Sequence, residues 1–349
     1  MTIAVLVLNY NGRSLLEECL SSVLASRGTS RANVYLVDNG STDGSVEYAK
    51  ERFPYVRTIT FDHNLGFAKA YDDAVKEVSE DIVIFLNNDV KVAKDWFESL
   101  VAPIESGSDE RLAICGSKIL FDFDRNRVNH AGGTLLPIGG GVDIDFLELD
   151  RGKPTKPKFV GCVSGASMAV KRTVFLELGG FDEDFFAYSE DTDFCWRAWL
   201  AGYKVMLVPR SLLYHKYGGT SGPYTDPRRV FLGERNRMQC LLKNLETTNV
   251  VIGMFVLFPM FILRMTRSQK SRRRRSILAL TQSYWWVIRN FSLILKKRLL
   301  AQEGRVVSDS FLQQHGLMMS YVQSLREFAR LSAARRKYPS IFISDEQGQ

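Results

Sequence analysis

The chain has 349 residues, of which 45% are hydrophobic and 24% charged, an ordinary globular composition that allows one large α/β domain with an appendage, or two domains. Residues 1–245 hold 29 Lys and Arg against 33 Asp and Glu, whereas residues 246–349 hold 17 against 6, so the basic character belongs to the C-terminal part. The five cysteines are widely spaced and form no CxxC pair, so no zinc site is evident in the sequence. This pattern fits reduced, cytosolic thiols.

The first half alternates between β-rich and helix-periodic segments. Residues 3–8 read IAVLVL, which is typical of a buried strand and too short for a signal peptide. Further strands are predicted at 34–37, 58–61 and 82–86, with helical patterns between them. This alternation predicts a mainly parallel, doubly wound sheet, in which ligands bind at the carboxyl ends of the strands.

Polar residues follow these strands at the predicted ligand-binding edge. Asp38 and Asn39 offer acceptors for a pyrimidine N–H or for ribose hydroxyls, although turn chemistry alone explains such residues equally well. Asp89 closes the fourth strand, where a carboxylate suits Mg²⁺ or Mn²⁺ held partly by a diphosphate. The chain has no GxxxxGK[ST], and no GxGxxG joins the first strand to the next helix, so a P-loop or dinucleotide site is disfavoured.

The second half contains a helix predicted at 96–104 and strands predicted at 112–120 and 165–170. Between the two strands, residues 121–157 are polar and Gly-rich without a clear period, which predicts a variable excursion on the acceptor side. His130 in this segment is expected to be a structural or surface residue rather than a catalytic one.

The side chains best suited to chemistry are concentrated in one later span. Glu190, Asp191 and Asp193 begin a helix-periodic segment, and His215 comes just past a short strand predicted at 205–208. A carboxylate at a helix start can accept a proton, and the histidine can hold a metal, with a slight preference for Mn²⁺. The alternative is that the acids only stabilise the helix start and that the histidine is structural.

A glycine-rich loop follows at residues 216–227. It is predicted to close over a bound diphosphate, with Arg228, Arg229 or Arg235 as phosphate partners. Solvated surface arginines are the alternative for these three residues.

The composition changes again near residue 249. Residues 250–263 and 277–300 are apolar, Trp285 and Trp286 lie in the second segment, and the run RMTRSQKSRRRR separates the two. This pattern predicts helices that lie in a membrane interface, peripheral or monotopic, on the cytoplasmic face of the cell membrane. An ordinary helical subdomain with a solvated basic face is the alternative, no nucleic-acid partner is expected, and the end from about residue 341 is expected to be disordered.

Six motifs occur in the order seen in family 2 glycosyltransferases: VLNYNG, VDNGSTDGS, NLGFA, LNND, the Glu190–Asp191 pair and the late His215. Over about residues 1–244 the chain resembles their rhamnosyltransferase-like branch. The resemblance implies a GT-A fold and an enzyme that transfers a hexosyl or rhamnosyl unit with inversion. The donor would be a UDP-, dTDP- or GDP-linked sugar, and the acceptor a hydroxyl of a glycan or lipid-linked glycan in cell-surface polysaccharide synthesis.

The resemblance also implies roles for individual residues. Asp89 and His215 would bind Mn²⁺ or Mg²⁺, and Asp191 would be the general base. Independently of the resemblance, Glu190 and Asp193 are expected to orient Asp191, to bind acceptor hydroxyls or only to cap the helix, and Arg228 and Arg235 are candidates for phosphate contacts. The nucleotide would be held by Leu8, Tyr10, Asn11, Asp38, Asn39, Asn64, Gly66 and Asn88. The chain departs from the family where only the last position of Asn87-Asn88-Asp89 is acidic, and where Asp72 replaces a frequent Asn.

The expected organisation is a GT-A domain over residues 1–245, with a nucleotide-sugar half (1–95) and an acceptor half (96–245). A basic amphipathic helical extension with a disordered end would occupy 246–349. A sugar nucleotidyltransferase is a competing hypothesis, but it needs a Gly-rich, Arg- or Lys-containing loop after the first strand. The other competing hypothesis is a non-catalytic, membrane-bound glycan-binding protein. The joint presence of Asp89, Asp191 and His215 argues against it.

Overall fold

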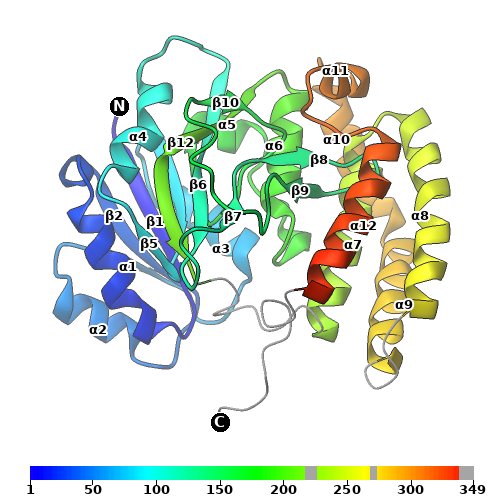
Figure 1. Ribbon diagram of the computed structural model, residues 1–349. Coiled ribbons are helices and arrows are strands. Elements are labelled where there is room, and N and C mark those ends of the chain that lie inside the picture. Colours follow the sequence, from blue (N-terminus) through cyan, green and yellow to red (C-terminus); the bar gives the residue numbers. More distant parts are fainter. Residues whose placement is uncertain (217–225, 268–272, 338–349) are drawn as a thin grey trace.

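A mixed β-sheet forms the centre of the computed structural model, which describes residues 1–216, 226–267 and 273–337 (Figure 1). Its main path runs β10-β12-β6-β11-β4-β1-β2-β3. The strands on this path are β1 (Ile3–Asn9), β2 (Asn33–Asp38), β3 (Arg57–Thr60), β4 (Ile82–Asn87), β6 (Leu112–Phe121), β10 (Lys158–Phe159), β11 (Ser167–Lys171) and β12 (Lys204–His215). The first four pair in parallel, as predicted, whereas β11 runs antiparallel to both neighbours.

Two hydrophobic cores cover the two faces of this sheet, because successive side chains of a strand point to opposite faces. Along β1, Val5 belongs to the core that contains Leu16 of α1 (Arg13–Ala25), and Leu6 belongs to the core that contains Tyr71 of α3 (Phe67–Lys76). The expected doubly wound arrangement is therefore present. The other helices packed around the sheet are α2 (Ser45–Arg52), α4 (Trp96–Glu105), α5 (Arg172–Glu177) and α6 (Glu190–Leu200).

Strand β12 is longer than the predicted 205–208. It runs parallel to β6 with a register shift between Val208 and Leu212, which includes Pro209, and then continues to His215. Proline lacks the N–H that a regular ladder needs, so a bulge accommodates it. His215 is therefore the last residue of the strand rather than a residue beyond it, and it pairs with Val90 of β5 (Val90–Val92).

The segment expected to be an irregular excursion contains short strands. β7 (Val128–His130) pairs with β6, and β8 (Gly133–Leu135) pairs with β9 (Gly141–Asp143). The absence of a period in the sequence reflects their length of three residues each. These strands are largely buried, so the segment is part of the domain core.

Helices follow the sheet: α7 (Pro227–Asn244), α8 (Thr247–Arg267), α9 (Arg273–Arg289), α10 (Phe291–Glu303), α11 (Asp309–Gln314) and α12 (Tyr321–Lys337). Figure 1 shows them gathered at one end of the molecule, where α7 packs against α6, α9 and α10. The predicted apolar segment 277–300 divides at Asn290 into α9 and α10. The end expected to be disordered lies outside the described residues, as does most of the glycine-rich loop.

The structure shows no membrane-crossing helix in the part of the chain that it describes. Over residues 1–216, 226–267 and 273–337, every helix is too short or too polar to cross a bilayer.

Candidate active site

Three strand ends meet at one edge of the sheet because β2, β1 and β4 are parallel neighbours. The Asn9 amide nitrogen donates to Asp38 Oδ1 (2.9 Å), and the Asn88 amide nitrogen donates to Asn9 Oδ1 (2.7 Å). Asn9 is fully buried, and its side chain joins Asp38 to Asn88, two of the residues expected to bind the nucleotide. It was not among the predicted site residues, although an Asn that closes a wholly apolar strand was a usable signal.

The loops after β2 and β3 are also joined. Asn39 donates to Asn64 Oδ1 (3.1 Å) and accepts from the N–H of Leu65 (2.9 Å), and Asn64 Oδ1 also accepts from the N–H of Gly66 (2.9 Å). Asn39, Asn64 and Gly66 are thus brought together as expected. Their amide groups hold one another, so their first role is to shape the edge of the site.

The end of β1 and the loop after it contribute the remaining expected nucleotide-binding residues. Tyr10 is exposed and Leu8 is half-buried. Asn11 has a φ of 48° and accepts from the N–H of Thr42 (2.8 Å), so its side chain closes the loop against its neighbour. An added Cβ at Gly12 would lie 2.2 Å from Asn88, which explains the glycine in NYNG.

Asp89 and His215 meet at the end of β4 and β12, with His215 Nε2 3.1 Å from Asp89 Oδ1. Asp89 is 3% exposed; burial raises the pKa of its carboxyl, but the charge and hydrogen bond of His215 outweigh burial and leave that pKa below its usual value. Asn129 Oδ1 lies 3.1 Å from His215 Nδ1 and accepts a hydrogen bond from it. His215 Nε2 therefore faces the carboxylate either as a second N–H or as a ligand that shares a cation with it.

This donor set fits a divalent cation, since a carboxylate oxygen and an imidazole nitrogen are suitable ligands for Mn²⁺ and Mg²⁺. No group of three or more His, Cys, Asp or Glu side chains with metal-binding geometry occurs among the described residues. Asp89 and His215 would hold such an ion, and the oxygens of a bound diphosphate are suitable further ligands.

Asp191 lies at the start of α6, next to the loop before β11. Its Oδ2 accepts from the N–H of Gly165 (2.8 Å), and its Oδ1 accepts from the N–H of Thr192 (2.6 Å). Burial raises the pKa of Asp191 although these two N–H groups oppose the shift. Ala166 in the same loop accepts from the N–H of Asn87 (3.2 Å), so one short segment links the base candidate to the strand end that carries Asp89.

Glu190 differs sharply from its neighbour. It is 5% exposed, and its Oε2 has no hydrogen-bond partner within the described residues. Burial and the nearby charge of Asp191 raise the pKa of Glu190 well above its usual value. Burial therefore favours the neutral form of Glu190, whereas the hydrogen-bonded Asp191 is the better proton acceptor of the pair.

His130 lies close to the loop that holds Asp191. Its Nδ1 lies 2.6 Å from Asp143 Oδ1, and its Nε2 accepts from the N–H of Ser164 (3.2 Å). The expectation of a structural histidine holds in that it is buried and fully paired. The sequence analysis missed the link from His130 to Asp191. His130 binds the N–H of Ser164, and the next residue, Gly165, donates its N–H to Asp191.

The residues expected to contact the acceptor or the phosphates are not brought together beside Asp89 and Asp191. Asp193 is fully buried and binds Lys243, Arg197 and Asn244. Arg235 is 7% exposed and donates to backbone carbonyls, and burial lowers its pKa to about 10. Arg228 is exposed and its guanidinium lies 4.8 Å from the ring centre of Phe186.

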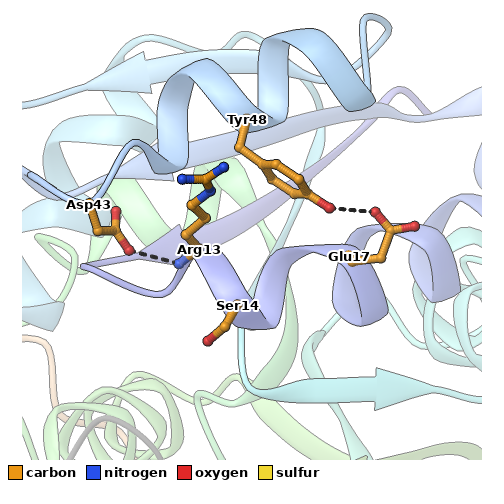
Figure 2. Close-up of a pocket in the computed structure, with 5 residues that line it drawn as sticks. All are labelled: Arg13, Ser14, Glu17, Asp43 and Tyr48. Atoms are coloured by element: carbon orange, nitrogen blue, oxygen red, sulfur yellow. Dashed lines mark hydrogen bonds between the residues drawn. The ribbon is translucent and has the colours of Figure 1, made fainter.

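A separate hollow of about 430 Å³ lies between α1 and α2 (Figure 2). It is lined by Arg13, Ser14, Glu17, Asp43 and Tyr48. Asp43 accepts from the N–H of Arg13 (2.9 Å), and Tyr48 donates to Glu17 (2.6 Å). These pairs tie the two helices together, and none of the lining residues belongs to the cluster around Asp89 and Asp191.

Comparison with known proteins gives a consistent result. The family model described as glycosyl transferase family 2 matches residues 4–179. An N-acetylglucosaminyl-diphospho-decaprenol L-rhamnosyltransferase of Mycobacterium tuberculosis is 30% identical over 241 residues, which cover 62% of this chain and 76% of that protein. The rhamnosyltransferase WbbL of Escherichia coli is 27% identical over 157 residues, 43% of this chain and 58% of that protein.

Solved structures share the fold. The crystal structure of GalNAc-T7 with UDP, GalNAc and Mn²⁺ is similar with a TM-score of 0.58 and 17% identity, and the match covers 84% of this chain and 57% of that one. The structure of S. aureus TarS matches with a TM-score of 0.55 and 15% identity over 87% of this chain and 52% of that one. The chain therefore spans just over half of each of these structures.

Proposed function

The chain belongs to glycosyl transferase family 2, and from this premise we propose that it is a metal-assisted, inverting transferase in which Asp191 is the general base. As a family member it is a glycosyltransferase that uses a nucleotide-sugar donor. The observation that carries the proposal is the position of Asp191, whose half-buried carboxylate accepts from the N–H groups of Gly165 and Thr192. Gly165 lies on the loop whose next residue, Ala166, is bonded to the strand end before Asp89.

In the proposed reaction the acceptor hydroxyl gives its proton to Asp191 while its oxygen forms a bond to the anomeric carbon. The bond between that carbon and the diphosphate oxygen breaks, and the electron pair leaves with the nucleoside diphosphate. A divalent cation held by Asp89 and His215 would neutralise the charge that grows on the leaving group. One displacement inverts the anomeric centre, and Glu190, whose burial favours its neutral form, stays beside the base without taking part in this step.

The proposed donor is a nucleotide-linked L-rhamnose, and the proposed acceptor is a hydroxyl of a lipid-linked glycan. The names of the M. tuberculosis and E. coli relatives support the sugar, and the name of the first supports a polyprenyl-diphosphate acceptor. The nucleoside would lie over the edge formed by Asp38, Asn39 and Asn64, where the amide groups fix the loop shape.

We further propose that the protein binds the cytoplasmic face of a membrane through its C-terminal helices. Large apolar side chains are exposed on α8, α9 and α10, among them Phe255 at 76%, Trp285 at 65% and Leu300 at 72%. The run RMTRSQKSRRRR at residues 264–275 is rich in arginine, which suits anionic lipid. The five cysteines are buried and free, which fits a reducing compartment.

A panel of UDP-, dTDP- and GDP-linked sugars, with L-rhamnose among the sugars, tests the donor assignment. A bound donor raises the thermal midpoint by mass action, and Mn²⁺ should strengthen that effect and support slow release of nucleoside diphosphate. No stabilisation and no turnover by any member of the panel, with or without Mn²⁺, would contradict the proposal. Turnover of sugar 1-phosphate with a nucleoside triphosphate would identify a nucleotidyltransferase instead.

A further inference from the structure

The segment that leads into α6 has a backbone that residues other than glycine rarely adopt. Phe186, Tyr188 and Ser189 have φ values of 59°, 74° and 68°. Such residues persist only when the surrounding structure holds them. Because Ser189 directly precedes Glu190 and Asp191, the shape of this segment determines where the Asp191 carboxylate enters the site.

Helix α7 holds this segment with buried side-chain donors. The Asn236 amide nitrogen lies 3.0, 2.9 and 2.7 Å from the carbonyl oxygens of Phe185, Ala187 and Tyr188. Asn236 is completely buried, and its own oxygen accepts from Arg235 Nε (2.9 Å). Arg235 also donates to the carbonyl of Phe185 (2.9 Å), so two adjacent residues of α7 satisfy the carbonyls of the strained turn.

The opposite side of the segment is held by α3. The Phe186 carbonyl accepts from the N–H groups of Phe67 (2.6 Å) and Ala68 (3.4 Å), in the NLGFA motif at the edge of the expected donor site. The segment is therefore fixed between the nucleotide-binding half on one side and α7 on the other. Asn236 lies beyond residues 4–179, so the family match assigns it no role.

The start of the segment has a second attachment to the C-terminal helices. Lys243 of α7 and Lys297 of α10 both donate to the Asp182 carboxylate, and Lys297 also donates to Asp184. These charges draw the pKa of Asp182 below its usual value although burial opposes the shift. The lysines fix where the segment begins, whereas Asn236 is bonded to the turn next to Asp191.

We infer that Asn236 is a positioning residue for sugar transfer: it holds the 185–189 turn so that Asp191 faces the acceptor hydroxyl. The inference rests on the proposed function, in which Asp191 is the general base. Asn236 touches neither donor nor acceptor in this arrangement, so its loss should lower turnover while donor binding stays. A displacement of about 1 Å at a reacting group lowers a rate by roughly 10²-fold.

Two variants separate the amide nitrogen from the rest of the side chain. Asn236→Asp keeps the size and the oxygen that faces Arg235 but places an acceptor against three carbonyl oxygens, and Asn236→Ala removes the group. Gln239→Leu is the matched control, because Gln239 is a fully buried amide on the same helix whose polar side-chain atoms have no partner within the described residues. Asp191→Asn is measured beside them.

The readouts are turnover of the nucleotide sugar that the donor panel identifies, binding of the matching nucleoside diphosphate with Mn²⁺, and the thermal midpoint. Both Asn236 variants should lower kcat by about 10–100-fold with the dissociation constant of the nucleotide within about threefold of wild type. Gln239→Leu should change neither quantity.

Near wild-type kcat in Asn236→Asp overturns the inference, and so does a loss of nucleotide binding that matches the loss of kcat, because a merely structural residue would affect both. If Asn236→Ala does not fold, Asn236→Asp decides alone. Full activity of Asp191→Asn contradicts the proposed base, and this inference with it. A dead Asp191→Asn beside a normal Asn236→Asp contradicts the inference only.

Discussion

At the scale of single residues, two adjacent carboxylates differ because their surroundings differ. Asp191 accepts two backbone N–H bonds, whereas Glu190 is buried with one oxygen that has no partner in the described chain. Hydrogen bonds to the charged form lower a pKa, and burial without them raises it. The same motif thus holds one carboxylate suited to accept a proton and one carboxyl whose burial favours its neutral form.

The pH profile should report Asp191. Burial raises its pKa, so the acidic limb of kcat/KM should lie above the pH at which an ordinary aspartate ionises, and activity should rise as pH increases through that limb. Rate measurements across the pH range with saturating Mn²⁺ check this. A profile that stays flat down to about pH 4 would contradict the assignment.

Asp72 makes a prediction about stability. Burial raises its pKa from the ordinary 3.8 to about 7, so between these values the folded state keeps a proton that the unfolded state has lost. Stability therefore falls as pH rises through this window and levels off above it. Asp72→Asn keeps an oxygen for the N–H of Phe181 and removes the titration.

Thermal unfolding of wild type and Asp72→Asn over pH 4–8 measures the difference. The variant should gain little near pH 4 and at least about 2 °C near pH 8, because about 1 kcal/mol shifts the midpoint of a large domain by a few degrees. A gain that is largest at low pH would have the wrong sign and would refute the account of Asp72.

At the scale of elements, a loop of the first half meets the segment before α6. Gly66 has a φ of 83°, and an added Cβ would lie 2.6 Å from Phe186. Gly107 also has a positive φ of 61° but has nothing within 4 Å of an added Cβ. The two positions therefore separate backbone strain from steric contact.

Gly66→Ala should lower the thermal midpoint by several degrees more than Gly107→Ala, because both add backbone strain and only the first displaces Phe186. It should also lower turnover, since Phe186 belongs to the turn before Asp191. Differential scanning calorimetry and donor turnover measure both effects. Equal midpoints for the two variants would show that the contact with Phe186 is unimportant.

The elements that the sequence predicts well are those with a strong local signal. The buried run at 3–8 and the strand at 112–120 are found within one residue at each end, because continuous apolar character marks a covered strand. β12 was predicted too short, since Pro209 ended the pattern while the bulge around it let pairing continue.

The site could be predicted in part. Asp89 and His215 are 126 positions apart, and the motif order brought both into one hypothesis that the geometry supports with a 3.1 Å approach. Arg235 and Asp193 were expected to contact the phosphates or the acceptor, but both are buried. Arg235 of α7 donates to a backbone carbonyl, and Asp193 binds Asn244 of α7. Asn236 carries no local signal, because its importance depends on a turn about fifty residues earlier.

At the scale of the whole molecule, the helical end is bonded to the segment that leads into α6. Lys297 of α10 binds Asp182 and Asp184 at the start of the turn before α6, so deletion of the C-terminal helices would remove that support. Surface substitutions therefore test membrane binding better than truncation does.

Phe255→Ser with Trp285→Ser should reduce binding of the full chain to anionic lipid vesicles at low salt by about 100-fold or more, since each large side chain contributes roughly 1.5–3 kcal/mol when buried and about 1.4 kcal/mol is tenfold. Tyr55→Ser is the control, because Tyr55 is 92% exposed in the first half of the chain. Sedimentation with vesicles measures the effect. Equal losses for both sets, or no binding by wild type, would contradict the membrane proposal.

The most direct test of the central claim compares Asp191→Asn with Asp89→Asn in transfer kinetics and donor titration. Loss of the base should lower kcat by about 10²–10⁴-fold with nearly unchanged donor affinity, whereas Asp89→Asn should weaken metal and donor binding. Glu190→Gln should cost less than Asp191→Asn, because burial favours the neutral form of Glu190, which glutamine resembles. Near wild-type transfer by Asp191→Asn together with an inactive Glu190→Gln would show that the base is the other carboxylate.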